Sequence, residues 1–203
     1  MIFSLKKENI LAIALITMII FTTIKMTKES EYYNLKCIIS KVDGNTYCVR
    51  DRRQMERSAD ILAKTTGKMQ ALVDHCYKEY PTRGNISRLK EKFNPTKIQE
   101  TLPNSEYTAY SENKGEKIAF CLDKQKNSGG LIDQNTLTFV AIHELAHVAS
   151  LSTQHDDEFW SNFKFLLIEA QKIKIYTPRD YKNNTQEYCG MDIVDNPYYD
   201  YNT

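Results

Sequence analysis

The sequence lacks a charge excess of either sign and contains few glycines and prolines. Its 27 lysines and arginines nearly balance 26 aspartates and glutamates, giving a net charge of +1. No overall field therefore favours a polyanion, and no nucleic-acid partner is expected. Only 7 glycines and 5 prolines interrupt a chain of 203 residues that is 41 % hydrophobic. No internal repeat is visible, so we expect one folded domain with appendages.

Cysteine motifs of the kind that bind metals are also missing. None of the five cysteines stands in a C-x-x-C pair, which argues against a cysteine zinc site. Two disulfides with one free thiol and five reduced thiols remain equally compatible with the sequence. Cys37 and Cys48 flank the turn signal "DGN" and form the best candidate pair.

The first 30 residues contain the one long apolar run. Residues 10–24, "ILAIALITMIIFTTI", carry no charge and have lysines on both sides. With Asn9 they would form a helix of about 24 Å, somewhat shorter than the roughly 30 Å hydrocarbon core of a bilayer. We predict a retained single-pass membrane anchor over residues 1–30, with the side of the membrane undetermined. A cleaved signal peptide and a buried helix are the alternatives.

Hydrophobic spacing in the remaining chain alternates between helix and strand patterns. Helices are expected over 51–80, ended by Pro81, and over 85–93; a strand pair around "ENKGE" follows, and then helices from Asn135 to about Leu151 and from Asp156 or Asp157 onward. This order predicts an α+β fold. The expected divisions are an anchor at 1–30, a membrane-proximal stalk at 31–49, a main domain at 50–175 and a Tyr- and Asn-rich extension at 176–203. Tyr107, Ile118, Phe120 and Leu122 are the expected inward positions of the strand pair.

The motif "HELAH", residues 143–147, carries the strongest chemical signal. His143 and His147 are four residues apart, so on a helix both imidazoles lie on one face, one turn apart. That is the spacing that lets two imidazoles bind one zinc ion. Glu144 is then placed to take a proton from a water activated by the metal. A helix with two solvent-facing histidines is the bland alternative.

A catalytic zinc site needs a third protein ligand. His155 follows His147 after seven residues, and a polar loop containing Ser150, Ser152 and Thr153 would allow it to fold back. The rivals are Glu158, one turn further on, and Glu169, 21 residues beyond His147.

"HELAH" followed by "HDDEFW" resembles the signature of the WLM and SprT-like metallopeptidases. The resemblance covers roughly residues 117–170 and implies that His143, His147 and His155 bind Zn²⁺ and that Glu144 is the general base. It also implies a zincin-like fold of the minigluzincin type, in which a small sheet packs on the active-site helix. "EKIAFCL", residues 116–122, would be the edge strand along which a substrate peptide aligns. The composition and the C-terminal segment are similar to anchored zincin-like proteins of large DNA viruses.

The sequence thus predicts a membrane-anchored zinc metallopeptidase acting on a protein or peptide. A catalytically silent zincin fold that serves as a membrane-tethered binding module is the main alternative, and a disulfide-stabilised surface protein without metal is a third. Trp160 is expected to pack on the active-site helix, and Met191 could lie beneath the metal. Candidates for a donor that stabilises the transition state are His75, Tyr176, Tyr181 and Tyr188.

Overall fold

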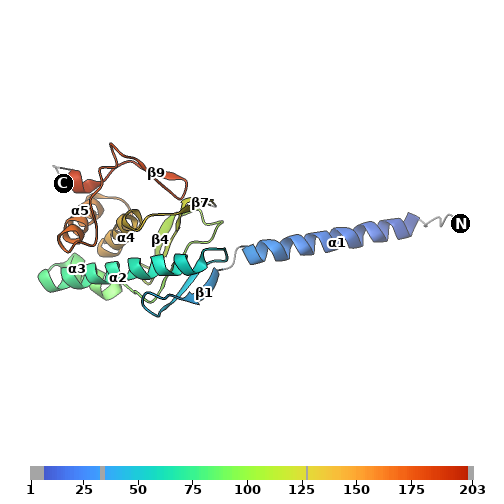
Figure 1. Cartoon of the computed structure of the whole chain (residues 1–203), viewed down its shortest axis with the longest axis horizontal. Coiled ribbons are helices and arrows are strands. Elements are labelled where there is room, and N and C mark those ends of the chain that lie inside the picture. Colours follow the sequence, from blue (N-terminus) through green and yellow to red (C-terminus); the bar gives the residue numbers. More distant parts are fainter. Residues whose placement is uncertain (1–6, 33–34, 127, 201–203) are drawn as a thin grey trace. The chain divides into compact units, whose positions relative to one another are not determined.

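The computed structural model describes residues 7–32, 35–126 and 128–200, and it divides the chain into two units, Met1–Asn34 and Leu35–Thr203 (Figure 1). The first unit contains one helix, α1 (Lys7–Tyr32). The hydroxyls of Thr17, Thr22 and Thr23 donate to carbonyls three and four residues earlier in this helix. The large apolar side chains described between residues 13 and 26 are all exposed.

The predicted membrane anchor is only partly testable, since residues 1–6 of the expected range 1–30 lie outside the described residues. Within the described residues, no helix combines the length and the hydropathy that crossing a bilayer requires. The uncharged stretch 10–24 would measure about 22 Å at 1.5 Å per residue, against about 30 Å of hydrocarbon. The helix that the sequence predicts is present, but the transmembrane span is not confirmed.

The second unit is built on a five-stranded mixed sheet with the order β1-β2-β3-β5-β4. Strands β1 and β2 are antiparallel, β3 is parallel to both β2 and β5, and β4 is antiparallel to β5. The two edges of the sheet are therefore β1 and β4. The bounds are β1 (Leu35–Ile39), β2 (Thr46–Arg50), β3 (Ile98–Glu100), β4 (Ala109–Glu112) and β5 (Lys117–Phe120).

The expected edge strand is wrong. Residues 116–122 contain β5, which lies between β3 and β4, while β4 forms the edge. Ile118, Phe120 and Leu122 are fully buried as expected, whereas Tyr107 is 65 % exposed. An uninterrupted apolar run such as "IAFCL" is typical of a strand covered on both faces, and that pattern fits an internal strand better than an edge.

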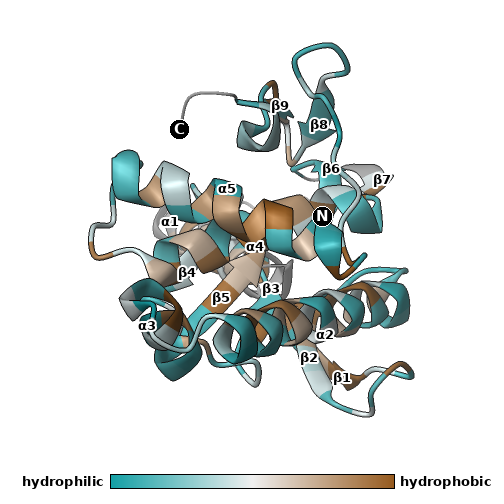
Figure 2. Ribbon diagram, turned by 90° about the vertical axis from the view of Figure 1, so that its left-hand side faces the viewer, coloured by the Kyte–Doolittle hydropathy of each residue, from teal (hydrophilic) through white to brown (hydrophobic). Residues whose placement is uncertain are grey.

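Four long helices surround the sheet, close to the expected ranges: α2 (Met55–Glu79), α3 (Gly84–Lys92), α4 (Gln134–Ala149) and α5 (Asp157–Lys172). Asp156 caps α5 as predicted, while the cap of α4 is Asp133 instead of Asn135. Helix α4 contacts α2, α3, α5 and β4, and hydrophobic residues extend along most of it (Figure 2). The observed class is α+β, with α4 at the centre of the core.

The C-terminal residues contribute to this core instead of extending from it. Tyr176, Tyr181 and Tyr188 are buried. A disulfide joins Cys121 to Cys189, and the expected Cys37–Cys48 disulfide also forms, which leaves Cys76 as a buried free thiol. The minor elements are β6 (Asp123–Gln125), β7 (Ser128–Leu131), β8 (Gln186–Tyr188), β9 (Met191–Ile193) and the 3-10 helix η1 (Pro197–Tyr199).

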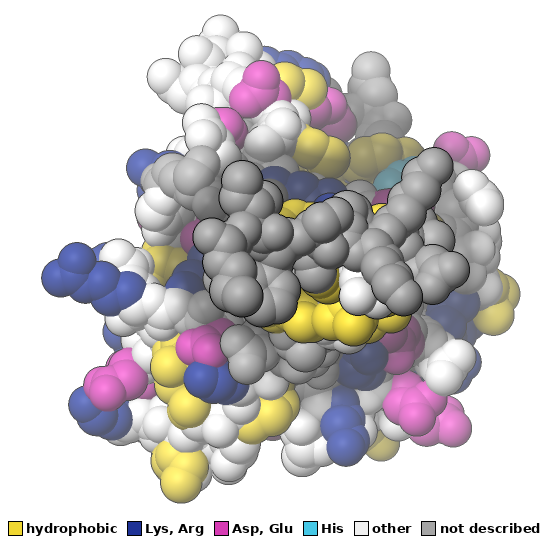
Figure 3. All heavy atoms as spheres, turned by 90° about the vertical axis from the view of Figure 1, so that its right-hand side faces the viewer, with side chains coloured by type: hydrophobic (Ala, Val, Ile, Leu, Met, Phe, Trp, Pro, Cys, Tyr) yellow, Lys and Arg dark blue, Asp and Glu magenta, His cyan; other side chains and the backbone are white. Residues whose placement is uncertain are grey.

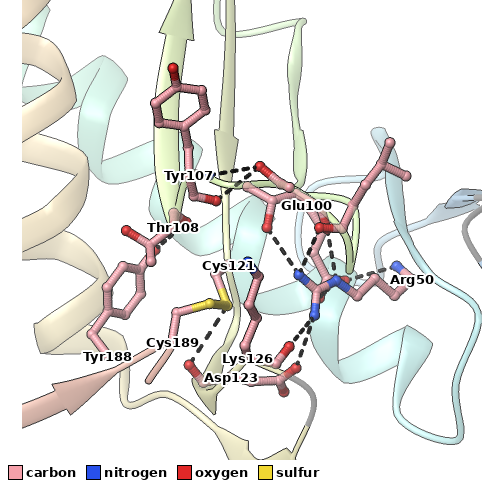
Figure 4. Close-up of a disulfide and its surroundings, with 12 residues drawn as sticks. Arg50, Glu100, Tyr107, Thr108, Cys121, Asp123, Lys126, Tyr188 and Cys189 are labelled. Carbon is pink, nitrogen blue, oxygen red and sulfur yellow. Dashed lines mark hydrogen bonds and ion pairs between the residues drawn. A yellow bond between two sulfur atoms is a disulfide. The ribbon is translucent and has the colours of Figure 1, made fainter. Parts of the chain in front are cut away.

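A buried ion network lies beside the Cys121–Cys189 disulfide (Figure 4). Glu100 is fully buried and accepts hydrogen bonds from the Arg50 backbone N–H at 2.8 Å and from the Arg52 guanidinium at 2.6 Å. Asp123 pairs with Arg52 and lies 3.5 Å from the Arg50 guanidinium. We call Arg50, Arg52, Glu100 and Asp123 the ion network. It connects β2, β3 and β6.

Candidate metal centre

Helix α4 places the first two histidines. The Asp133 carboxylate accepts hydrogen bonds from the backbone N–H groups of Asn135 and Thr136, which fixes the first turn. From there a mostly apolar sequence buries the helix. His143 and His147 emerge on one face with ring centroids 4.9 Å apart, and both are partly buried.

His155 completes a cluster of three imidazoles. After α4 ends, the loop of residues 150–154 turns back, and His155 immediately precedes α5. Its Nε2 lies 3.2 Å from Nε2 of His143 and 3.1 Å from Nε2 of His147. Within the described residues these three histidines are the only group of side chains arranged to hold a metal ion. We call them the metal centre.

The geometry and the charge of the metal centre both fit zinc. Ligand nitrogens at 2.0–2.1 Å from a tetrahedral ion are about 3.3 Å apart, close to the two observed separations. Burial, together with the adjacent rings of His147 and His155, lowers the pKa of His143 to about 3. Burial, His155 and the charge of Lys114 lower the pKa of His147 to about 4. Both rings are thus neutral at physiological pH, which is the form that binds metal.

An aromatic side chain supports all three rings from below. Phe159 is fully buried, and its ring centroid lies 4.9 Å from His143, 4.4 Å from His147 and 4.5 Å from His155. Phe163 contacts His143 at 5.2 Å. Such an apolar shell fixes ring orientation and limits access of water from that side. Trp160, expected against the active-site helix, is instead 39 % exposed and lies beside His155.

Glu144 is buried but borders the same cleft as the metal centre. Burial raises the pKa of its carboxyl to about 8. A divalent cation held by the three imidazoles would favour the carboxylate form, because an opposite charge nearby stabilises it. Glu144 is therefore placed where a base for a metal-activated water would be required.

The two rival ligands are engaged elsewhere. Glu158 accepts a hydrogen bond from the Leu151 backbone N–H at 2.9 Å and pairs with Arg88. Glu169 binds His75 at 2.9 Å and Lys172 at 2.6 Å. The geometry therefore favours His155 as the third ligand.

The metal centre lies in a cleft of about 1050 Å³, bordered by the edge strand β4. The opposite wall is α4 with its histidines and Glu144. The cleft is lined by Leu102, Asn104, Ser105, Tyr107, Ala109, Tyr110, Ser111, Glu112, Asn113, Lys114, His143, Glu144, His147, Thr153 and His155.

The candidate transition-state donors do not border this cleft. His75 is bound to Glu169, and the Tyr188 hydroxyl donates to the Thr108 carbonyl at 3.2 Å. Tyr188 is buried close enough to Glu144 for the carboxylate charge to raise its pKa. Met191 is 56 % exposed and does not lie under the metal centre. Tyr107 and Tyr110, which do line the cleft, were missed because the sequence gave no register for β4.

Comparison with known proteins places these residues in a family. The family model of the WLM domain matches residues 87–200, which include the whole metal centre and Glu144. No solved structure matches the chain.

Relatives from large DNA viruses match nearly the whole chain, as the sequence resemblance suggested. An uncharacterized protein of Acanthamoeba polyphaga mimivirus is 30 % identical over 192 residues, covering 90 % of this chain and 92 % of the relative. One of Invertebrate iridescent virus 6 is 24 % identical, covering 90 % of this chain and 98 % of the relative. One of Invertebrate iridescent virus 3 is 35 % identical over 99 residues, covering 49 % of this chain and 57 % of the relative.

Proposed function

The chain belongs to the WLM domain family, and from that premise we propose that it is a zinc-dependent metallopeptidase with a zincin-like catalytic domain of the minigluzincin type. The observation that carries the proposal is the convergence of three Nε2 atoms beside a buried glutamate in one cleft. A structural zinc site is normally closed by four protein ligands, whereas a catalytic site has three and keeps one position open. Three histidines next to Glu144 match the catalytic type.

In this proposal His143, His147 and His155 hold the ion. When bound, zinc lowers the pKa of a water molecule and polarises the scissile carbonyl. Glu144 accepts the proton of the attacking water and then delivers it to the leaving amine. The carboxylate is aimed into the cleft from the same helix as two of the ligands, and the Phe159 ring keeps the imidazoles oriented meanwhile.

The cleft wall suggests how a peptide would bind. Strand β4 is an edge of the sheet, and the cleft residues Ala109 and Ser111 belong to it. An extended peptide can add to such an edge through backbone hydrogen bonds, which selects for backbone conformation more than for side chains. We therefore expect extended protein or peptide segments as substrates.

Glu144→Gln tests the reaction. The variant should retain zinc, because the ligands are unchanged, and lose about 10²- to 10⁴-fold in turnover of a denatured, fluorescently labelled protein. Zinc content by elemental analysis and cleavage rate are measured on the same samples. Equal turnover of variant and wild type would remove Glu144 as the base. A wild type that binds zinc but cleaves none of a panel of denatured proteins would favour the silent binding module.

Membrane association stays a separate proposal about α1. It is supported by the exposed apolar side chains of this helix, such as Phe21 at 69 % and Met26 at 68 %. Exposed apolar surface of this extent is typical of segments that meet lipid or a partner. The full chain should co-sediment with phospholipid vesicles, and a chain starting at Leu35 should not. Equal sedimentation of the two chains would remove the proposal. On the face shown in Figure 3, basic side chains are interspersed with acidic ones, in line with our expectation of no nucleic-acid partner.

A further inference from the structure

The turn between β4 and β5 presses against the C-terminal end of α4. Its residues Asn113, Lys114 and Gly115 all have positive φ, at 46°, 57° and 108°. A Cβ at Gly115 would lie 2.9 Å from the Lys92 carbonyl oxygen and 2.9 Å from a methyl of Val148, so only glycine fits. Left-handed backbone is costly for the other two residues and persists only where the surroundings fix it. The turn is thus held in one position relative to α4.

From this turn the Lys114 side chain extends over the end of the helix. Its Nζ donates to three consecutive carbonyl oxygens, those of Ser150 at 2.9 Å, Leu151 at 2.7 Å and Ser152 at 2.6 Å. An ammonium group has three N–H donors, so these carbonyls use all of them. A cation also interacts favourably with the negative end of the helix dipole. Lys114 therefore binds the end of α4 both by hydrogen bonds and by charge.

The three carbonyls belong to the loop that leads from His147 to His155. Ordering the backbone of each loop residue costs about 1–2 kcal/mol, so a loop that presents a ligand needs contacts to hold it. Glu158 and Asn162 contribute from α5, binding the Leu151 N–H and the Ser150 hydroxyl. Lys114 holds the same loop from the opposite wall of the cleft, the wall formed by the edge strand.

We propose that Lys114 is a positioning residue of the metal centre: by fixing the carbonyls of residues 150–152 it keeps His155 within reach of the ion bound by His143 and His147. The inference rests on the proposed zinc function and adds a residue outside the ligand set. It also connects the β4–β5 turn to the metal centre, so that the wall along which substrate would lie and the third ligand share one support.

Lys114→Met tests this role on the full chain. The substitution keeps the side-chain length and removes the three donors. We expect its zinc affinity, measured by competition with a chromophoric chelator, to fall by about 10-fold or more, the usual effect of losing a group that orients a ligand. The matched control is Lys117→Met in the same hairpin. Lys117 pairs with Glu112 at 2.7 Å instead of the loop, and its loss should leave zinc affinity unchanged.

A double variant separates positioning from general damage. If Lys114 acts through His155, Lys114→Met should weaken zinc binding in the wild type and add nothing in a His155→Ala background, because interacting positions are non-additive. The visible spectrum of the Co²⁺-substituted protein should shift in the same direction for Lys114→Met as for His155→Ala. Circular dichroism verifies folding; if Lys114→Met does not fold, Lys114→Gln, which keeps fewer donors, replaces it with a smaller expected loss.

The outcomes distinguish the two levels of the argument. Zinc bound equally by wild type, Lys114→Met and Lys117→Met would overturn the positioning role and leave the proposed metallopeptidase intact. Equal losses from Lys114→Met with and without His155 would also overturn it, since the effect would not pass through that ligand. A folded wild type that binds neither Zn²⁺ nor Co²⁺ would overturn the metal function and the positioning role together.

Discussion

The metal centre and the ion network are both polar clusters inside one small domain, but they are assembled in opposite ways. The three histidines and Glu144 come from residues 143–155, one helix and the loop after it. Arg50, Arg52, Glu100 and Asp123 come from three strand ends and loops up to 73 residues apart, counted from Arg50 to Asp123. The first cluster is written locally in the sequence, and the second exists only in the folded chain.

The difference separates function from stability. Apolar packing of Phe159 and capping of α4 position the metal centre, and its histidines bear little of the fold, since two are partly buried and His155 is exposed. The ion network lies where β2, β3 and β6 meet, and its Glu100 is fully buried. We therefore expect substitutions in the network to affect mainly the free energy of unfolding, and substitutions in the metal centre to affect mainly metal binding.

The largest effect on unfolding is expected from Glu100→Ala. It leaves the Arg50 backbone N–H and the Arg52 guanidinium without their partner, and breaking a buried ion pair costs about 3–5 kcal/mol. Urea denaturation of the metal-free protein measures the change. The matched control is Lys36→Ala, which breaks the exposed Lys36–Asp51 pair at 2.6 Å and should cost less than about 1 kcal/mol. Equal losses in the two variants would contradict the contrast.

Removing the disulfide beside the network should have the next largest effect. Cys121 and Cys189 are separated by 68 residues, and loss of a bridge typically costs about 2–4 kcal/mol. A Cys121→Ser, Cys189→Ser double variant should show this loss in urea denaturation. The corresponding variant of Cys37 and Cys48, whose separation is 11 residues, should lose less because its loop is shorter. The reverse order would show that the entropy of loop closure does not govern these bridges.

A smaller effect, about 1 kcal/mol at pH 7, is expected from Asp133→Ala at the start of α4. Burial raises the pKa of Asp133, but hydrogen bonds from Thr136 and the charge of Arg179 lower it more, so the folded value lies below the ordinary 3.8. Its stabilisation is therefore complete above that ordinary value and is lost as pH falls through the folded pKa. The difference between wild type and variant in urea denaturation should shrink on acidification to pH 3. A constant difference would exclude the carboxylate as its source.

The smallest effect on unfolding is expected from His155→Ala. As an exposed position it should change the stability of the metal-free protein by no more than about 0.5 kcal/mol. Zinc affinity should nevertheless fall more than it does in Glu169→Ala, because Glu169 binds His75 and Lys172 away from the metal centre. Chelator competition measures both variants. A larger loss in Glu169→Ala would reassign the third ligand.

The same contrast explains which parts of the molecule could be predicted from the sequence. Helix periodicity and Pro81 gave α2, the Asp156 cap gave the start of α5, and the spacing of His143, His147 and His155 predicted a cluster that the fold brings together. These signals act over a few residues. They need no knowledge of what packs against what.

Predictions that depended on pairing between distant segments were the ones that failed. The edge position of β4 depends on β5 pairing with β3, and the ion network depends on three strands meeting. Neither leaves a local pattern. Lys114 also had no signal in the sequence, because its partners are backbone carbonyls 36 to 38 residues away. Trp160 and Met191 were placed by residue type alone, and both are exposed.

The edge position of β4 has a consequence for what the cleft can accept. Its four residues span about 13 Å, and only a segment without secondary structure of its own can pair with them over that length. A folded protein would have to open locally before it fits, and that opening has a free energy that differs from one protein to another. Selection among substrates would then follow their mechanical and thermal looseness, so that damaged or partly unfolded proteins are cut while intact ones with the same sequence are spared.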